Sequence, residues 1–315
     1  MEMLTKSFWD KNNIWSEVVA DNMVVRGNAL DVLRAIPDCV IDAVITSPPY
    51  YSLRDYGDDV VTKWDDGWVG ALGLEESVSQ YLVHILSIFR EVKRVLKDTG
   101  SIFVNLGDSY EDKSLLCIPF RFAIAMVEDG FLLRNDIIWE KVNCLPQSAK
   151  DRFCNNFEHV FFFSKSRTYY FKQQFEPLST GTRQRMQYDW TRKTTTEGRG
   201  TLEYGDSLSG ELFNEAIEEM KLRGVRNRRS VWSIPTESNS LTHFAVYPER
   251  LCWICLDAGC PVDGVVLDPF AGAGTTGVVA IKQKKKSILI ELHADYINIM
   301  VKRLKETQPV LFGER

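Results

Sequence analysis

Five consecutive residues, Thr46 to Tyr50, combine hydroxyl groups, two prolines and an aromatic ring. Pro48 and Pro49 lack amide hydrogens and have a restricted φ, so their turn is stiff and its carbonyl oxygens stay free to accept hydrogen bonds. Ser47 adds a second acceptor, and Tyr50 offers a flat surface for stacking. This combination suits a reaction on an amino nitrogen conjugated with a ring, because two acceptors can take its hydrogens and turn its lone pair.

A second, distant segment supplies the parts of a cofactor site. An apolar run at 265–267 leads into the sequence DPFAGAGTT (268–276), which is followed by an apolar helical stretch to Ile281. A strand at 287–290 comes next and ends at Glu291. Glycines let a backbone approach a ligand closely, and the Glu291 carboxylate can accept both hydroxyls of a ribose. The order of strand, glycine turn, helix and acid-terminated strand predicts a cofactor-binding unit.

Taken together, these segments resemble the S-adenosylmethionine-dependent DNA amino-methyltransferases. The tetrapeptide SPPY (47–50) is similar to the catalytic motif of that family, and DPFAGAGTT to its cofactor motif. The catalytic motif comes first, which resembles the permuted β group. The resemblance covers roughly residues 20–165 and 225–306, and further matching stretches lie at 26–30, 51–57, 107–110, 139–143 and 243–251.

The resemblance implies roles for the residues of the first segment. We expect Ser47 Oγ and the Pro48 carbonyl to accept the hydrogens of a cytosine or adenine amino group, with Pro49 stiffening the turn. Both hydrogen bonds would strengthen as the nitrogen becomes positive, which stabilises the transition state selectively. A base inside a duplex cannot reach the methyl donor, so it must flip out. Tyr50 is expected to stack on that base.

By the same resemblance, a larger set of residues holds S-adenosylmethionine. Asp268 is expected at its ammonium group, Glu291 at its ribose and Asn28 near its adenine ring. Thr275 and Thr276 open a helix, whose exposed amides suit a carboxylate. The expected cofactor residues are Asn28, Thr46, His243, Phe244, Asp268, Phe270, Gly272, Gly274, Thr275, Thr276 and Glu291.

The resemblance favours the N4 amino group of cytosine as the methyl acceptor. Ser47 resembles the first motif residue of the cytosine-N4 enzymes, whereas adenine-N6 enzymes usually carry Asp or Asn there. Adenine N6 therefore stays as the alternative target. Methylation at cytosine C5 is not expected, because the chain has no Pro-Cys pair to supply a nucleophile. Double-stranded DNA is the expected partner, a cognate restriction endonuclease is a further one, and monomer and homodimer both stay open.

Two rival interpretations belong to other classes of protein. Gly272, Gly274 and Gly277 also fit the G-x-G-x-x-G pattern of a nicotinamide-dependent dehydrogenase, and Glu291 stands near the spacing of its ribose-binding acid. The SPPY motif has no role in hydride transfer, so this interpretation leaves it unexplained. The other rival is a DNA-binding module without catalysis, against which an intact Ser47 and glycine turn argue.

Composition is typical of a soluble globular protein, with 44% hydrophobic and 26% charged residues. No apolar run approaches the roughly 20 residues of a membrane span. Seven scattered cysteines, an odd number, argue against a complete disulfide framework and for a reducing cytoplasm. Cys252 and Cys255 form a Cys-x-x-Cys pair, but no second pair or histidine stands at metal spacing, so no metal site is expected.

Charge is distributed unevenly along the chain. The whole chain carries −5, yet residues 165–229 hold 13 Lys and Arg against 9 Asp and Glu. Within them, residues 221–229 include five basic residues and no acid. A basic island on an acidic body suits an enzyme that grips DNA phosphates with one region. The candidates for DNA contact are Arg183, Arg185, Arg226, Arg228 and Arg229.

Hydrophobic periodicity predicts the elements that must position these residues. The expected fold is α/β, with a doubly wound, mostly parallel, Rossmann-like methyltransferase sheet and circularly permuted motif order. Residues 1–165 and 226–315 are expected to form the two parts of the catalytic domain, and 166–225 an inserted DNA target-recognition region. Residues 51–74 read as a long loop. Expected strands lie at 23–26, 40–45, 102–106, 132–139, 159–164 and 287–290, and helices at 29–36, 75–97, 118–128 and 211–222.

Overall fold

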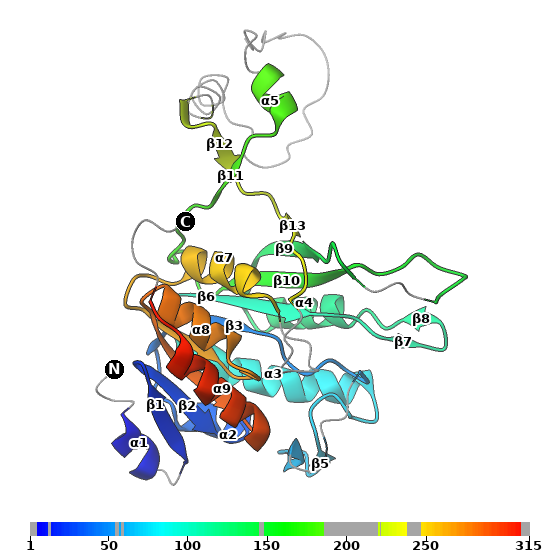
Figure 1. The fold of residues 1–315 in the computed structure, drawn as a ribbon. Helices are drawn as coiled ribbons and strands as arrows, with labels where there is room; N and C mark the ends of the chain where they lie inside the picture. The colour runs from blue at the N-terminus through cyan, green and yellow to red at the C-terminus, as the bar shows by residue number, and fades with distance from the viewer. Residues whose placement is uncertain are drawn as a thin grey trace. The chain divides into compact units, whose positions relative to one another are not determined.

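A computed structural model describes residues 5–11, 14–53, 57, 60–144, 148–185, 220, 222–237 and 247–309 (Figure 1). The chain folds into two compact units. The first unit joins Met1–Lys172 to Ser230–Arg315, and the second is Gln173–Arg229. Among the described helices, none is long and apolar enough to cross a membrane.

One sheet dominates the first unit. Within the described residues it has nine strands, in the order β1-β2-β15-β14-β3-β6-β10-β9-β13. The strands are β1 (Ser16–Val19), β2 (Asn22–Arg26), β3 (Ile41–Thr46), β6 (Leu96–Leu106), β9 (Leu132–Glu140), β10 (Phe157–Ser164), β13 (Val231–Ser233), β14 (Val265–Asp268) and β15 (Lys286–Glu291). The helices are α1 (Lys6–Lys11), α2 (Ala29–Ala35), α3 (Val78–Val95), α4 (Ile118–Glu128), α7 (Glu249–Gly259), α8 (Thr275–Lys282) and α9 (Ala294–Glu306).

The run of strands from β2 to β6 is parallel throughout. β10 then pairs antiparallel with both β6 and β9, and β13 lies parallel to β9. In the centre of the sheet, β14 lies beside β3 although the two strands come from opposite ends of the chain, with Val266 opposite Ala43 and Leu267 opposite Val44. This arrangement confirms the predicted mostly parallel sheet with permuted motif order.

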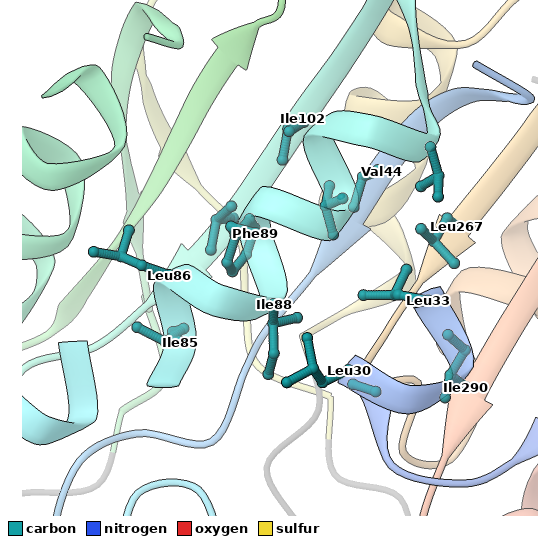
Figure 2. Close-up of a cluster of buried hydrophobic side chains, with 14 of the residues drawn as sticks. Leu30, Leu33, Val44, Ile85, Leu86, Ile88, Phe89, Ile102, Leu267 and Ile290 are labelled. Carbon is teal, nitrogen blue, oxygen red and sulfur yellow. The ribbon is translucent and has the colours of Figure 1, made fainter. Parts of the chain in front are cut away.

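Helices cover both faces of the sheet, and the central strands β3, β14 and β15 are accordingly buried along nearly their whole length. Val44 of β3 and Ile290 of β15 belong to the larger core, together with Leu30 from α2 and Phe89 from α3 (Figure 2). On the opposite face, residues such as Ile45 pack with apolar side chains of α7 and α8. The ligand-binding edge of such a doubly wound sheet is the one at the carboxyl ends of its parallel strands.

Most of the expected elements occur, and the exceptions have local causes. The helix α4 begins at Ile118 and ends at Glu128, as predicted. The helix predicted to reach Lys97 ends at Val95, because the chain enters β6 at Leu96 without a loop. The long loop predicted at 51–74 contains two short antiparallel strands, β4 (Thr62–Lys63) and β5 (Val69–Gly70).

The second unit is described for residues 173–185, 220 and 222–229. In it, β11 (Phe175–Pro177) pairs antiparallel with β12 (Val225–Asn227), and α5 (Thr180–Arg185) follows β11. This unit begins at Gln173 and ends at Arg229, a few residues later at each end than the insert expected at 166–225. The helix expected at 211–222 falls mostly outside the described residues.

Candidate active site

A cavity of about 160 Å³ lies at the carboxyl ends of the central strands. Ser47 and Pro49 from the proline turn line it, and so do Phe270 and Gly272 from the glycine turn. Glu291, at the end of β15, also lines the cavity. The two segments singled out in the sequence therefore share one cavity.

A direct side-chain contact joins the two segments. Thr46 Oγ1, at the end of β3, donates to Asp268 Oδ1 at 2.7 Å, although the two residues are 222 positions apart in the chain. The contact forms because β3 and β14 are parallel neighbours, so that both strands end at the same edge of the sheet. The strand pairing thus holds the proline turn against the glycine turn.

Asp268 is the anchor of this arrangement. Its carboxylate accepts hydrogen bonds from the hydroxyls of Thr46, Thr276 and Tyr247 and from the Phe270 amide. The side chain is 1% exposed, and burial raises the pKa of the carboxyl although the four donors oppose that shift. Asp268 does not line the cavity. Its donors are all supplied from within the protein, so its position favours a role in holding the turn over the expected contact with the cofactor's ammonium group.

Several other expected cofactor residues also lie behind the cavity wall. Thr46 and Thr276 are buried, and their hydroxyls donate to the Asp268 carboxylate. Thr275, in contrast, lines the cavity. Tyr247 also lines the cavity, and its hydroxyl contacts both Asp268 and Thr276. The sequence predicted no role for Tyr247, because its position in the chain does not indicate that the fold brings its hydroxyl to Asp268.

Glycine is required in the turn for two different reasons. Gly272 has a φ of 50° and lines the cavity, and a Cβ there would meet nothing within 4 Å. Glycine is therefore favoured at position 272 by its backbone conformation and not by lack of space. Gly274 has a φ of 80° and precedes α8, and a Cβ there would lie 2.4 Å from Met300 Cγ. Its small size lets the turn pack on α9. Arg303 of α9 supports the turn further by donating to the Ala273 carbonyl.

Glu291 faces the cavity while holding the backbone around it. Its carboxylate accepts from the amides of Gly272, Leu292 and His293, each at 2.8 Å. Burial raises the pKa of this carboxyl, and the amide hydrogen bonds partly offset the shift. A carboxylate offers about four acceptor positions, so capacity remains for a ligand hydroxyl. Asn28 lines the same cavity and caps α2, because its Oδ1 accepts from the Leu30 amide at 2.8 Å.

The long loop after the proline turn forms a further wall. Thr62, Trp64 and Leu72 line the cavity. Trp64 is stacked on His84 of α3, with ring centroids 4.2 Å apart, and Trp68 stacks on the same imidazole at 5.3 Å.

Two carboxylates contact the two ring nitrogens of His84. His84 Nδ1 lies 2.9 Å from Glu75 Oε1, and Nε2 lies 3.1 Å from Asp66 Oδ2. We call His84, Glu75, Asp66, Trp64 and Trp68 the histidine clamp. The sequence predicted a long loop here but not the clamp, whose members meet only when the loop folds back on α3.

The clamp should matter for cofactor affinity. Replacing His84 with phenylalanine keeps a ring between the two indoles but removes both hydrogen bonds and leaves the buried Glu75 carboxylate without its imidazole. We expect binding of S-adenosylhomocysteine to weaken by about tenfold, on the order of 1.4 kcal/mol, in isothermal titration calorimetry. Val83→Ala, at an exposed neighbour on the same helix, is the control. Wild-type affinity in the His84 variant would show that the clamp does not shape the cavity.

The catalytic end of the site lies at the proline turn. Pro48 is buried in the turn, and the Pro49 carbonyl accepts from the Tyr81 hydroxyl at 2.8 Å. Ser47 Oγ donates to the Tyr50 hydroxyl at 3.3 Å. The Tyr50 ring packs on Gly107, where a Cβ would lie 2.6 Å from the ring. Burial, followed by the charge of Glu158, raises the pKa of Tyr50 well above its usual value.

The expected DNA contacts lie in the second unit, and the structure gives three of them partners within that unit. Arg226 Nε and Arg229 Nε each lie 2.7 Å from Glu176 Oε1. Burial raises the pKa of this carboxyl, but hydrogen bonds from Arg229 and Arg226 outweigh that effect and lower it. Arg228 Nη2 donates to the Phe175 carbonyl at 3.3 Å.

The remaining predicted site residues are Arg183, Arg185, His243 and Phe244. Arg183 lies exposed on α5, which ends at Arg185. His243 and Phe244 lie outside the described residues.

Comparison with known proteins agrees with this geometry. The family model described as DNA methylase matches residues 41–302. The chain is 35% identical to Type II methyltransferase M.Cfr9I of Citrobacter freundii over 89% of its own length and 86% of that protein's. It is 32% identical to Type II methyltransferase M.SmaI of Serratia marcescens, covering 89% and 90% of the two chains.

Solved structures show the same fold. The PvuII DNA methyltransferase (cytosine-N4-specific) superposes with a TM-score of 0.62 at 19% identity, covering 95% of this chain and 97% of that one. A DNA modification methylase from Thermus thermophilus, solved in complex with S-adenosyl-L-methionine, gives a TM-score of 0.56 at 21% identity, with 92% and 98% covered. The family match spans most of the sheet and both segments of the cavity, and the chain belongs to the DNA methylase family.

Proposed function

We propose that this DNA amino-methyltransferase transfers a methyl group from S-adenosylmethionine to the N4 amino group of a cytosine flipped out of duplex DNA. The observation that carries the proposal is the shared cavity, which Ser47 and Pro49 line together with Gly272 and Glu291. A dehydrogenase would have no use for the proline turn at that position, and the family match speaks against that class.

The residues of the cavity suit S-adenosylmethionine. Glu291 presents a carboxylate with capacity for a ribose hydroxyl, and Gly272 leaves space above the turn. Trp64 and Phe270 supply apolar walls for a flat ring. When bound, the cofactor supplies a methyl group that its sulfonium has already activated.

The proline turn acts on the acceptor base. The lone pair of an exocyclic amino group is delocalised into the ring, so the nitrogen is a weak nucleophile. Ser47 Oγ and the Pro48 carbonyl accept its two hydrogens and so direct the lone pair toward the donor. Positioning of this kind contributes roughly 7–11 kcal/mol at best. The Tyr50 ring, held against Gly107, is the proposed stacking surface for the base.

Cytosine N4 is favoured over adenine N6 by Ser47, the first residue of the motif. The PvuII enzyme, which shares the fold, is described as cytosine-N4-specific. Adenine N6 remains the second candidate, because the matching family model covers both kinds of amino-methyltransferase.

Expression in a host without methylation of its own separates these targets. Mass spectrometry of digested DNA should detect N4-methylcytosine, and sequencing with detection of modified bases should locate it at one recurring sequence. The Ser47→Ala variant provides DNA from an equally expressed control. N6-methyladenine alone would assign the other amino group, and absence of both modified bases would refute the proposed function.

The second unit is the proposed target-recognition region, and its basic residues the proposed phosphate contacts. Glu176 pairs with Arg226 and Arg229 and so neutralises part of that charge. Glu176→Gln should therefore tighten non-specific DNA binding and steepen its dependence on salt, since each added phosphate contact contributes about 0.9 to the slope. Fluorescence anisotropy at several salt concentrations measures both.

Control variants separate charge from folding of the unit. Arg183→Ala, at an exposed residue of α5, should weaken DNA binding and flatten the salt slope. Gln173→Ala, which removes a neutral contact to Asn227, should leave the slope unchanged. A slope that stays the same in both the Glu176 and the Arg183 variants would remove this face from the DNA interface.

A further inference from the structure

A row of polar side chains crosses the sheet beside the proline turn. Thr46 pairs with Val104, so Ser47 follows at the level of Asn105 on β6. Asn105 pairs with Val160 on β10, and Glu158 lies two residues before Val160, on the same side of that strand. The sheet thus brings Ser47, Asn105 and Glu158 to one face at the edge where the cavity lies.

Hydrogen bonds connect this row in one direction. Ser47 Oγ donates to the Tyr50 hydroxyl at 3.3 Å, and that hydroxyl donates to Glu158 Oε2 at 2.8 Å. Asn105 Nδ2 donates to the same carboxylate oxygen at 3.0 Å and to the His159 carbonyl at 3.2 Å. A hydroxyl has one hydrogen to donate and two lone pairs to accept with. Because the chain ends on a carboxylate, the Ser47 hydrogen points toward Tyr50 and the Tyr50 hydrogen points toward Glu158.

The far end of this hydrogen-bonded chain is a partly buried ion pair. Lys141, the residue after β9, pairs with Glu158 Oε1. The side chains of Lys141 and Glu158 are 24% and 15% exposed. The Lys141 ammonium also lies 4.9 Å from the centre of the Trp139 ring. Within the part of the chain that the structure describes, the charged and titratable groups in contact with Glu158 are the Lys141 ammonium and the Tyr50 hydroxyl.

We propose that Glu158 is a positioning residue that acts through Tyr50 to keep Ser47 a hydrogen-bond acceptor and to receive the proton released by the base. The inference rests on the proposed function and extends it beyond the proline turn. A serine hydroxyl alone can rotate to donate to the base instead. The Glu158 carboxylate fixes the direction of the hydrogen bonds, because it can only accept a hydrogen bond from Tyr50 and cannot donate one.

The proton balance of the step is complete. The amino nitrogen gains a methyl group and becomes positive, so one of its N–H bonds must break. That proton passes to Ser47 Oγ as the serine hydrogen passes to the Tyr50 oxygen and the tyrosine hydrogen to Glu158 Oε2. Ser47 and Tyr50 end unchanged, the base is neutral, and Glu158 is a carboxylic acid that later loses its proton to water.

A purely structural role for Glu158 would give different results. If Glu158 only fixed the Tyr50 ring as a stacking surface, a glutamine would serve nearly as well, because its amide oxygen can accept from the same hydroxyl. Glutamine can neither carry the charge nor take a proton. The change Glu158→Gln thus separates the two roles with little change in shape.

The test compares single-turnover methylation by three variants, Glu158→Gln, Tyr50→Phe and the double variant. Each single change should lower the rate at least about tenfold, a modest value for lost proton-transfer catalysis. The double variant should be no slower than the slower single variant, because both changes break one chain. The loss of rate toward acidic pH and the solvent deuterium isotope effect should both disappear in Glu158→Gln.

Control measurements keep other causes apart. Glu140→Gln alters the neighbouring carboxylate at the end of β9, which accepts from Ser233 Oγ and has no part in the chain, so it should keep the wild-type rate. Calorimetry with S-adenosylhomocysteine should give wild-type affinity for Glu158→Gln. The fluorescence of 2-aminopurine at the target position should show that base flipping is retained.

Each outcome is decisive. A Glu158→Gln enzyme with the wild-type rate and pH profile would overturn the proposal, and so would additive losses in the double variant. Weak flipping with normal chemistry once the base is out would also overturn it, in favour of a stacking role alone. Absence of amino-group methylation by the wild-type enzyme would instead refute the proposed function.

Discussion

Replacing Ser47 with alanine should lower the rate of methyl transfer by about a hundredfold or more, while cofactor affinity stays at the wild-type value. The expected loss is that of an active-site group whose hydrogen bond strengthens as charge develops. Ser47 directly follows β3 and lines the cavity, and its hydroxyl donates to the Tyr50 hydroxyl. The change therefore removes an acceptor without opening the core.

Single-turnover kinetics with excess enzyme measures the rate, and calorimetry with S-adenosylhomocysteine measures cofactor affinity. Ser87→Ala is the matched control, because its hydroxyl donates to the His84 carbonyl of its own helix and Ser87 does not line the cavity. That variant should transfer methyl groups normally. An undiminished rate in Ser47→Ala would withdraw the catalytic assignment of the proline turn.

Replacing Asp268 with alanine should have the largest effect on stability. Four donors converge on this carboxylate in a site that is 1% exposed. Each buried donor left without a partner costs about 1–3 kcal/mol, and relaxation among the three hydroxyls recovers part of that. We expect the free energy of unfolding to fall by about 3–5 kcal/mol, and cofactor binding to be lost with the geometry of the glycine turn.

Urea unfolding followed by circular dichroism measures this change. Asp268→Asn should be intermediate, since the amide keeps an oxygen acceptor but must place two hydrogens among donors. Asp65→Ala removes an exposed carboxylate that pairs with Arg34, and should leave the midpoint near the wild-type value. An Asp268→Ala protein as stable as wild type would show that the carboxylate does not hold the turn.

Local chemistry explains why some elements could be predicted without the fold. The helix α4 begins at Ile118 with proline in its first turn and ends beside Gly130, which has a φ of 82°. Proline and glycine restrict or relax the backbone whatever surrounds them. The strand β3 was evident for a similar reason, because a run of β-branched residues is interrupted by two prolines.

Long-range contacts explain what could not be predicted. The sequence predicted Arg226 and Arg229 as candidates for DNA contact but gave no sign that both would pair with Glu176, some 50 residues earlier in the chain. The histidine clamp likewise needs the loop to return to α3. An ion pair or a ring stack between residues far apart in the sequence depends on their distance in space, which the local sequence pattern does not determine.

The chain alone determined the family resemblance, the mostly parallel sheet and the two segments that line the cavity, because prolines, glycines and apolar periodicity act within a few residues. Only the tertiary structure decided that Asp268 lies behind the cavity wall, and that Glu158, which is paired with Lys141, accepts from the Tyr50 hydroxyl beside Ser47. The reason is that parallel and antiparallel pairing places residues side by side across strands that the sequence keeps far apart.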